Sequence, residues 1–275
     1  MADAGIVLLG RRYRVERNFA RPSEPFGFIS QVAAGPNGEA YVLQRRDPPV
    51  VVIGPSGEQI GAFGQGRILD GHGISVDDKG RVWVVDRDSH EIICFSPEGE
   101  ELMTIGARDN PGLDEPFNHP TKAMSASDGA VYVSDGYGNH HMHKFSSEGD
   151  HLLTWGGAGK GPGQFSTPHA VAETADGRIL VTDRENGRVQ VFDADGNFLD
   201  QWTGFYNPMD VLVTDQDQVI VSDQVPRLYL LTSSGEVIGR CRGSINGAHG
   251  IAAAPDGTLY LAELPPANLT RLCPI

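Results

Sequence analysis

Three of the nine histidines in the chain recur at one position of a repeated pattern. His72, His169 and His249 each begin a fifteen-residue stretch typical of two short β-strands joined by a tight turn, such as HGISVDDKGRVWVVD. Three imidazole nitrogens that leave a fourth ligand position open are typical of catalytic zinc, whereas structural zinc sites are closed by four protein ligands. Iron, nickel, copper and cobalt also bind imidazole. The pattern therefore predicts one transition-metal ion, most simply zinc.

The stretches that carry these histidines belong to a sixfold repeat. Aligned without gaps, the six fifteen-residue units begin at Gln31, His72, Thr121, His169, Met209 and His249. After the fourth unit, RVQVF and NFLDQW add two more β-prone runs. Four antiparallel strands then fit into about 40 residues, the size of one propeller blade. We therefore predict an all-β, six-bladed β-propeller that forms a single domain over residues 1–275.

In a propeller, the first strand of each blade lines the central channel, so the first residues of the six units should form a ring around the axis. Histidine occupies this ring in alternate units only. Alternate blades of six are related by a third of a turn, so the three imidazoles should approach the axis from three sides. The alternative is that they are unrelated core or surface residues.

The last unit lacks a fourth strand, because the chain ends with NLTRLCPI, which supplies only a third. The β-like run Tyr13–Ala20 is expected to pair with the strand near Leu269–Cys273 and so to close the ring inside the last blade. Closure of this kind removes an open sheet edge. Residues 1–12 are expected to be loosely held.

The ends of the second strands should lie on the same face as the histidine ring, because the two strands of each unit are antiparallel. Four of these end residues are aspartates, which we expect to cap the turns that follow them: Asp86, Asp135, Asp183 and Asp223. Arg45 ends the first unit and breaks the pattern. Its guanidinium would suit a substrate carboxylate held by two hydrogen bonds, or alternatively a salt bridge to a neighbouring blade.

The turns and the ring supply three further candidates. Tyr137 lies between two glycines in DGYGN and is a candidate proton carrier, or alternatively a residue packed over the channel rim. Arg184, in the turn RENG, is a candidate contact for an anion, and Met209 is a candidate substrate contact. Three clustered histidines outside the ring position are expected on the surface: His140, His141 and His143.

Composition narrows the classes of partner. The net charge is −14, and no basic patch stands out, which argues against nucleic-acid binding. No apolar run is long enough for a transmembrane helix, and the N-terminal apolar patch lacks the basic residues that precede a signal-peptide core. Cys94, Cys241 and Cys273 form no spaced motif, which favours a reducing compartment. We therefore expect a cytoplasmic protein with no membrane partner.

Four motifs carry a resemblance to a known family: HGISVDDKGRVWVVD, VYVSDGYGN, GPGQFSTPHAVA and VTDRENGRVQVF. They resemble NHL repeats and, more closely, the lyase domain of peptidylglycine α-amidating enzymes, from about Gly71 to the end and more weakly through the first unit. The resemblance implies cleavage of a peptidyl α-hydroxyglycine to a peptide amide and glyoxylate. It also implies a zinc ion on the three ring histidines, a base at Tyr137, and arginines at Arg45 and Arg184 that match family positions.

Two departures from that family stand out. The family's third histidine is followed by an aspartate that helps to hold a structural calcium, whereas Gly250 follows His249 here, so calcium is not expected. Both members of each family disulfide are also absent, with Asn118 and Gly138 at one pair and Leu180 and Val191 at the other. This pattern fits an intracellular homologue that acts on a small molecule.

Three functions remain open on the residues alone. The first is a metal-dependent lyase that cleaves the C–N bond of an α-hydroxyglycine-type carbinolamide, or a similar hydroxylated small molecule, to an amide or amine and a carbonyl product. The second is a metal-hydroxide hydrolase or hydratase that acts on a small ester, lactone or amide. The third is a non-catalytic NHL scaffold, which has no use for histidines in alternate blades. The expected partner in the first two is a small molecule that bears a carboxylate.

Overall fold

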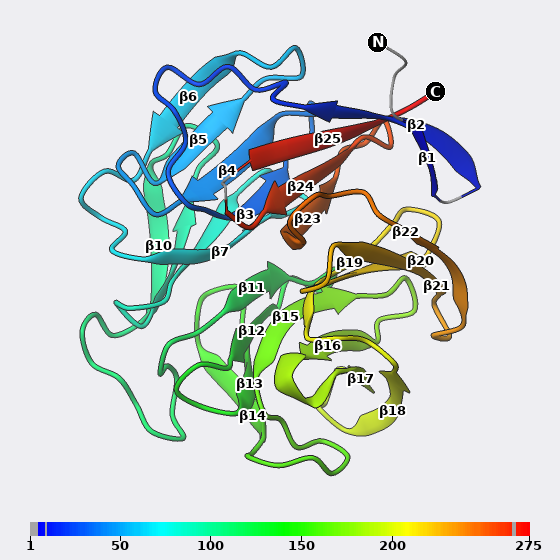
Figure 1. Cartoon of the computed structure of the whole chain (residues 1–275). Coiled ribbons are helices and arrows are strands. Elements are labelled where there is room, and N and C mark those ends of the chain that lie inside the picture. The colour runs from blue at the N-terminus through cyan, green and yellow to red at the C-terminus, as the bar shows by residue number, and fades with distance from the viewer. Residues whose placement is uncertain (1–4, 9, 266–267) are drawn as a thin grey trace.

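The computed structural model describes residues 5–8, 10–265 and 268–275. These residues form six antiparallel sheets arranged around a central axis, with one short 3₁₀ turn, η1 (Arg184–Asn186). The innermost strands contact one another in the closed order β3, β7, β11, β15, β19, β23 and back to β3. Figure 1 shows the six sheets as blades of one propeller. The predicted all-β, six-bladed fold is therefore confirmed.

The strands of each blade run from the axis outward, as follows. Blade 1 contains β3 (Ile29–Ala34), β4 (Ala40–Gln44), β5 (Val50–Ile53) and β6 (Gln59–Phe63). Blade 2 contains β7 (Gly71–Val76), β8 (Val82–Asp86), β9 (Glu91–Phe95) and β10 (Glu101–Gly106). Blade 3 contains β11 (Lys122–Ser125), β12 (Val131–Asp135), β13 (His141–Phe145) and β14 (His151–Gly156).

The remaining blades follow the same plan until the chain ends meet. Blade 4 contains β15 (Pro168–Glu173), β16 (Ile179–Asp183), β17 (Arg188–Phe192) and β18 (Phe198–Thr203). Blade 5 contains β19 (Pro208–Val213), β20 (Gln218–Asp223), β21 (Arg227–Thr232) and β22 (Val237–Cys241). Blade 6 contains β23 (Ala248–Ala253), β24 (Leu259–Glu263) and β25 (Asn268–Pro274), and then β2 (Arg11–Arg17) and β1 (Gly5–Leu8).

The hydrophobic core lies between neighbouring blades. One apolar cluster joins blades 1 and 2 through Leu43, Val50 and Ile74, and another joins blades 2 and 3 through Trp83 and Phe117. A middle strand is therefore covered on both faces, which accounts for its continuous apolar runs. The outer strands β10 and β18 have only one covered face, and most of their residues are exposed or half-buried.

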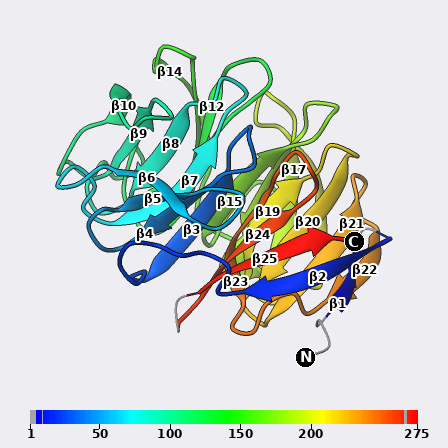
Figure 2. The same ribbon diagram turned by 90° about the horizontal axis from the view of Figure 1, so that it is seen from above.

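The ring closes as the sequence predicts, although with different bounds. Strand β2 pairs antiparallel with β25, from Tyr13 opposite Pro274 to Arg17 opposite Thr270, and the side chain of Tyr13 is buried. The two strands lie side by side in Figure 2. The closing strand therefore spans residues 11–17 instead of 13–20.

Part of the segment 1–12, which the sequence predicts to be loosely held, is a strand in the described structure. Strand β1 pairs with β2, from Gly5 opposite Arg14 to Leu8 opposite Arg11, and adds a fifth strand to the last blade. Leu8 is buried in the cluster that also contains Tyr13, whereas the rest of the strand is exposed or half-buried. Residues 1–4 and 9 lie outside the described residues.

The register of the first unit differs by one residue from the sequence alignment. In each of five inner strands, one residue bulges out of the ladder next to the second strand: His72, His169, Met209, His249 and Ser30. The equivalents of His72 and Asp86 in the first blade are therefore Ser30 and Gln44, not Gln31 and Arg45. In the third blade the equivalent residue, Thr121, directly precedes β11.

A turn residue explains the slip. The ninth residue of each of the last five units adopts a positive φ angle, which is +78° at Gly80, +80° at Gly177 and +56° at Asp217. This left-handed conformation favours glycine. In the first unit the residue with positive φ is Gly38, at +82°, and counting back from it gives Ser30 as the first residue. Gly38 therefore indicates the correct register of the first unit, which the gap-free alignment missed.

Deletion of residues 1–20 should abolish the cooperative unfolding transition, because it removes β2 and leaves β25 as an open edge. Deletion of residues 1–10 removes only β1. It should lower the midpoint of the unfolding transition, and the transition should remain cooperative. Thermal and urea unfolding monitored by circular dichroism distinguish the two. A 21–275 fragment that melts like the full chain would show that β2 does not close the ring.

Candidate functional site

The three ring histidines meet on the propeller axis. They lie on the innermost strands of alternate blades, β7, β15 and β23, and the bulge in each strand directs the side chain toward the channel. The centroids of the rings of His72, His169 and His249 are 5.0 Å apart in all three pairs. All three residues are buried, and one potential ligand atom of each lies within 4.8 Å of the others. The structure thus brings the three predicted metal ligands together.

Backbone carbonyl groups orient all three imidazoles. The Nδ1 atom of His72 is 2.7 Å from Thr121 O, that of His169 is 2.5 Å from Met209 O, and that of His249 is 2.6 Å from Ser30 O. A carbonyl oxygen can only accept, so Nδ1 must carry the hydrogen, and the neutral ring keeps its free lone pair on Nε2. Each acceptor belongs to the next blade around the ring. The odd-numbered blades therefore orient the histidines of the even-numbered blades.

Burial also keeps these imidazoles neutral. Loss of solvation lowers the pKa of His72 and His169 well below the ordinary value, and lowers the pKa of His249 to about 4. Metal binding requires neutral imidazole, so no proton needs to be displaced at pH 7. One potential ligand nitrogen of each ring lies within 4.8 Å of the other two, so one ion could contact all three. Three fixed nitrogen donors with one open side fit a catalytic zinc ion.

Tyr137 reaches the same point from the loop after β12. Its hydroxyl oxygen is 3.1 Å from Nε2 of His72 and 3.1 Å from Nε2 of His169. Nη1 of Arg184 donates a hydrogen bond of 2.9 Å to this oxygen. Burial raises the pKa of the Tyr137 hydroxyl, and the positive charges of Arg184 and Arg87 oppose that rise. The predicted proton carrier therefore contacts two of the three predicted metal ligands.

Three arginines occupy equivalent positions on this rim. Arg45, Arg87 and Arg184 directly follow the second strands of blades 1, 2 and 4. The carboxylate of Asp70 bridges the first two, with Oδ1 2.7 Å from Nε of Arg45 and an ion pair between Oδ2 and Arg87. The salt bridge to a neighbouring blade, offered as the alternative role of Arg45, is thus present. Its guanidinium also lies 4.8 Å from the centre of the Phe28 ring.

Sequence reasoning missed Arg87 and Asp70. A signal for Arg87 was available, because Asp86-Arg87 repeats the Asp183-Arg184 pair at the end of the second strand of the fourth unit. Asp70 carried no comparable signal, since it stands in a connection whose length and composition vary from blade to blade. Met209 lies in the ring, with its side chain buried and its carbonyl on His169.

The buried carboxylates at the ends of the second strands hold two loops at once. Asp135 and Asp183 accept hydrogen bonds from side chains of the turns that follow, Asn139 and Asn186, as expected. All of them also cap the loops that lead into the first strands. Asp86 accepts hydrogen bonds from the backbone nitrogens of Leu69 and Asp70. The same contact recurs at Asp135 from Asn118, at Asp183 from Ser166, at Asp223 from Tyr206, at Glu263 from Ile245 and Asn246, and at Gln44 from Gly27. The donors precede the ring position by three or four residues, or by two at Asp70. These contacts therefore fix where each inner strand begins.

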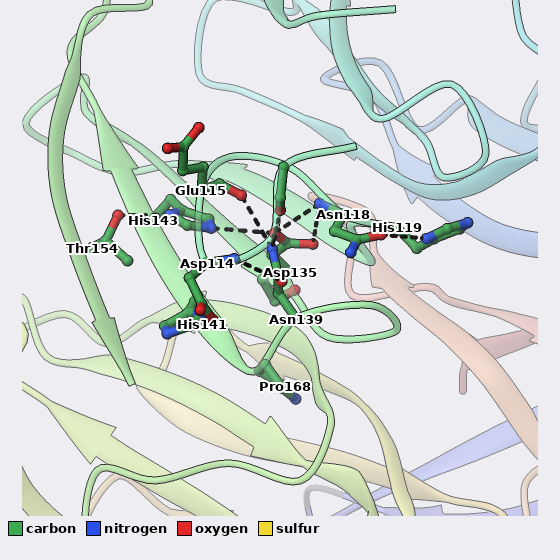
Figure 3. Close-up of polar contacts among 12 residues, drawn as sticks. Asp114, Glu115, Asn118, His119, Asp135, Asn139, His141, His143, Thr154 and Pro168 are labelled. Carbon is green, nitrogen blue, oxygen red and sulfur yellow. Dashed lines mark hydrogen bonds and ion pairs between the residues drawn. The ribbon is translucent and has the colours of Figure 1, made fainter. Parts of the chain in front are cut away.

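The expectation of a surface position is wrong for His143, which is buried beneath the tyrosine loop. Its Nε2 lies 3.3 Å from Oδ2 of Asp135, and its Nδ1 lies 2.8 Å from Oγ1 of Thr154. Asp135 also accepts a 2.8 Å hydrogen bond from Nδ2 of Asn139 (Figure 3). Asp135 and Asn139 flank the turn that holds Tyr137, so this network supports the turn from below. His140 and His141 are half-buried.

The positions of the family's two disulfides are adjacent in space here without any sulfur. Gly138 donates a backbone hydrogen bond of 2.9 Å to Asn118 O, and Leu180 stands opposite Val191 in the β16–β17 ladder. The three cysteines are free. Among the described residues, no helix is long and apolar enough to cross a membrane.

Comparison with known proteins agrees with this architecture. The NHL repeat model matches residues 72–95 and 165–192. The chain is 31% identical to mouse NHL repeat-containing protein 3, over 83% of this chain and 72% of the relative. The chain belongs to the NHL-repeat proteins. This NHL-repeat chain is also 33% identical to mouse peptidyl-glycine α-amidating monooxygenase over 255 residues, which cover 81% of the chain.

A second group of relatives is named for lyase activity. A probable peptidyl-α-hydroxyglycine α-amidating lyase of Caenorhabditis elegans is 25% identical, over 91% of this chain and 84% of the relative. The match to the mouse monooxygenase spans only 26% of that protein's length. Among solved structures, a streptogramin B lyase matches 96% of this chain with a TM-score of 0.71 at 12% identity, which speaks for the shared fold alone.

The buried histidines should make the metal-free protein less stable in acid. The folded pKa of His249 is about 4, below the ordinary 6.5, so the unfolded chain binds more protons between these values. Stability is therefore complete above about pH 6.5 and falls as the pH decreases toward 4, by on the order of 3 kcal/mol for this residue. Urea unfolding of chelator-treated protein at pH 7, 5.5 and 4.5 measures the effect.

A His249→Gln variant should show a weaker pH dependence than the parent, whereas the exposed His151→Gln should match the parent. Equal pH dependence in the parent and His249→Gln would contradict the assignment of the effect to the ring.

Proposed function

We propose that the chain is a metal-dependent lyase that cleaves the C–N bond of an α-hydroxyglycine-type carbinolamide. The products would be an amide and glyoxylate, or a related carbonyl compound. The observation that carries the proposal is the convergence of three Nε2 lone pairs and the Tyr137 hydroxyl on one point of the axis. Homology to amidating lyases favours this chemistry over other reactions of a three-histidine site.

His72, His169 and His249 would hold the metal ion, most simply zinc. A bound zinc ion would act as a Lewis acid toward the substrate hydroxyl and lower its pKa. The protein's contribution is a set of donors already in the correct tautomer, since the Nδ1–H groups are engaged by carbonyls. Such outer contacts fix ring orientation and raise ligand basicity.

Tyr137 would carry the proton through the reaction. Arg184 and Arg87 favour the phenolate through their charges, and Arg184 also donates a hydrogen bond to the tyrosine oxygen. The step starts from the phenolate of Tyr137, which takes the hydroxyl proton of the substrate, and the carbon that bore the hydroxyl becomes a carbonyl as the C–N bond breaks. The departing amide nitrogen then takes the proton from Tyr137. The proton is conserved, and no oxidant or water is consumed.

Arg45 would hold the substrate carboxylate. Its Nε is engaged by Asp70, while its two terminal nitrogens make no hydrogen bond to any described residue. A cavity of about 300 Å³ beside it is lined by Arg46, Arg108 and Leu69 as well as Arg45. Arg184 would supply a second anion contact, and Met209 would limit the space at the ring. A compact substrate with a carboxylate next to the carbinol carbon suits this arrangement.

The free thiols and the missing family disulfides support a cytoplasmic location, and we propose that the substrate is a small metabolite and not a secreted peptide. No calcium is proposed at the family position. An added Cβ at Gly250 would lie 1.4 Å from Oε1 of Gln31, so a larger residue there requires the Gln31 side chain to move.

Purified protein incubated with an N-acyl-α-hydroxyglycine should release glyoxylate and the N-acyl amide in equal amounts. Chelation should stop the reaction, and added zinc should restore it. Quantification of both products by chromatography is the measurement. Release of a carboxylic acid without glyoxylate would instead indicate a hydrolase.

Metal content in the same samples provides the control. We expect about one ion per chain, with loss of metal in His72→Ala, His169→Ala and His249→Ala but not in the half-buried His141→Ala. Full metal retention in any two of the three ring variants would rule out the ring as the metal site.

Tyr137→Phe should keep the metal and reduce kcat by roughly 10²–10⁴-fold, the usual range for a lost proton carrier. Arg45→Lys should mainly raise KM, because lysine cannot replace a two-pronged contact to a carboxylate. Steady-state kinetics on the same substrate separate the two effects. A near-parental kcat in Tyr137→Phe would return Tyr137 to a role in packing the rim.

A further inference from the structure

A second layer of residues lies directly beneath the histidine ring. It consists of the residue that follows each ring position, and its members in blade order are Gln31, Gly73, Lys122, Ala170, Asp210 and Gly250. The even-numbered blades, which carry the histidines, contribute only glycine or alanine. The odd-numbered blades contribute the three polar side chains. The upper layer therefore has its histidines in the even-numbered blades, and the lower layer has its polar side chains in the odd-numbered blades.

The three polar side chains meet across the channel. Lys122 Nζ forms an ion pair with Oδ1 of Asp210, and Nε2 of Gln31 donates a 3.1 Å hydrogen bond to Oδ2 of Asp210. The Asp210 carboxylate also accepts hydrogen bonds from the backbone nitrogens of Ile251, at 2.9 Å, and Val211, at 3.0 Å. Asp210 has no exposed surface. One carboxylate thus joins blades 1, 3, 5 and 6.

The small residues in the other blades leave room for this network. An added Cβ at Gly250 would lie 1.4 Å from Oε1 of Gln31, and one at Gly73 would lie 2.4 Å from Thr121 O, the acceptor of the His72 hydrogen bond. Backbone and side-chain atoms of the odd-numbered blades occupy that space. The glycines after His72 and His249 therefore have a packing reason.

The network is linked to the ring by planar peptide bonds. Gln31, Lys122 and Asp210 directly follow the residues whose carbonyls accept from the ring histidines: Ser30, Thr121 and Met209. The carbonyl oxygen of one residue and the Cα of the next lie in one rigid plane. When the contacts of a side chain fix the position of its Cα, they therefore also limit rotation of the carbonyl group of the preceding residue.

We propose that Lys122, Asp210 and Gln31 are positioning residues that hold the three acceptor carbonyls, and through them the tautomer and orientation of the histidine ring. The correspondence is one to one. Lys122 acts on His72 through Thr121, Asp210 acts on His169 through Met209, and Gln31 acts on His249 through Ser30. The network also separates the ring from a cavity of about 310 Å³ on the opposite side, which Lys122 lines and no ring histidine lines.

A purely electrostatic role makes different predictions. Lys122→Met would leave an unpaired carboxylate beneath the ring and favour a cation there, whereas Asp210→Asn would leave an ammonium and oppose it. The neutral double variant Lys122→Met/Asp210→Leu would restore parental behaviour if charge alone mattered. A positioning role predicts that all three variants weaken the site, since each removes a link across the axis.

The first readout needs no metal. In metal-free protein with ¹⁵N-labelled histidine, nuclear magnetic resonance should show the three ring histidines in the Nδ1–H tautomer, with Nδ1–H protons that exchange slowly with water. The double variant should accelerate this exchange at least about tenfold. Gln31→Met leaves the ion pair intact and should accelerate the exchange of His249 more than that of His72 or His169. A matched control is Lys144→Met/Asp128→Asn, which removes a peripheral ion pair of blade 3.

The second readout is zinc affinity by chelator competition. We expect all variants of the network to bind zinc about 10–100-fold more weakly than the parent, as for other outer contacts of metal ligands. Removal of one member of a buried ion pair can unfold a protein, and the neutral double variant and Gln31→Met avoid an unpaired charge. A folded double variant with three slowly exchanging Nδ1–H protons and parental zinc affinity would overturn the proposal.

This inference rests on the proposed metal site only for the second readout. If the parent binds no zinc, the proposed function fails, and the exchange of the Nδ1–H protons still decides whether the network positions the ring.

Discussion

The hydrogen bonds from Nδ1 of each ring histidine to a carbonyl of the next blade are the contacts on which the site depends. They assign the hydrogen to Nδ1 and therefore direct three lone pairs toward the axis. They also cross a blade boundary, so no single blade can orient its own histidine. The ring has a defined geometry only when the six blades form a closed circle. The orientation of the histidines therefore depends on strand β2, which completes the last blade.

Two further constraints place these hydrogen bonds. The buried acceptor at the end of each second strand, a carboxylate in five blades and the Gln44 amide in the first, holds the loop that enters the blade and sets the point where the inner strand begins. The bulge then turns one residue out of the ladder and into the channel. A regular strand would place this residue on the alternating faces that pack against neighbouring blades. The repeat thus builds a ring of six positions, and the identity of each residue decides what the ring does.

Each arginine on the rim of the site is paired with a carboxylate. Arg45, Arg87 and Arg184 stand at equivalent positions, and Asp70, Asp88 and Glu185 pair with them. Three fixed guanidinium groups can therefore sit around one site without a large net charge. Their partners distinguish them: Arg184 donates to the Tyr137 hydroxyl, whereas Arg45 lies over the Phe28 ring and its terminal nitrogens form no hydrogen bond to a described residue. The far side of the ring is closed by the Lys122–Asp210 pair.

The sequence by itself determined the blade count, the alternation of histidines around the axis and the face on which Tyr137 and the arginines lie, because strand polarity and a gap-free repeat transmit position along the chain. The gap-free alignment misplaced the first unit by one residue, because it did not use the turn glycine Gly38 to set the register. Only the tertiary structure decided which groups the buried carboxylates cap, that His143 lies beneath the tyrosine loop, and that Lys122 meets Asp210 across the channel. Lys122 and Asp210 lie 88 positions apart in different blades, and no local pattern encodes such a contact. Its formation depends on the closed ring.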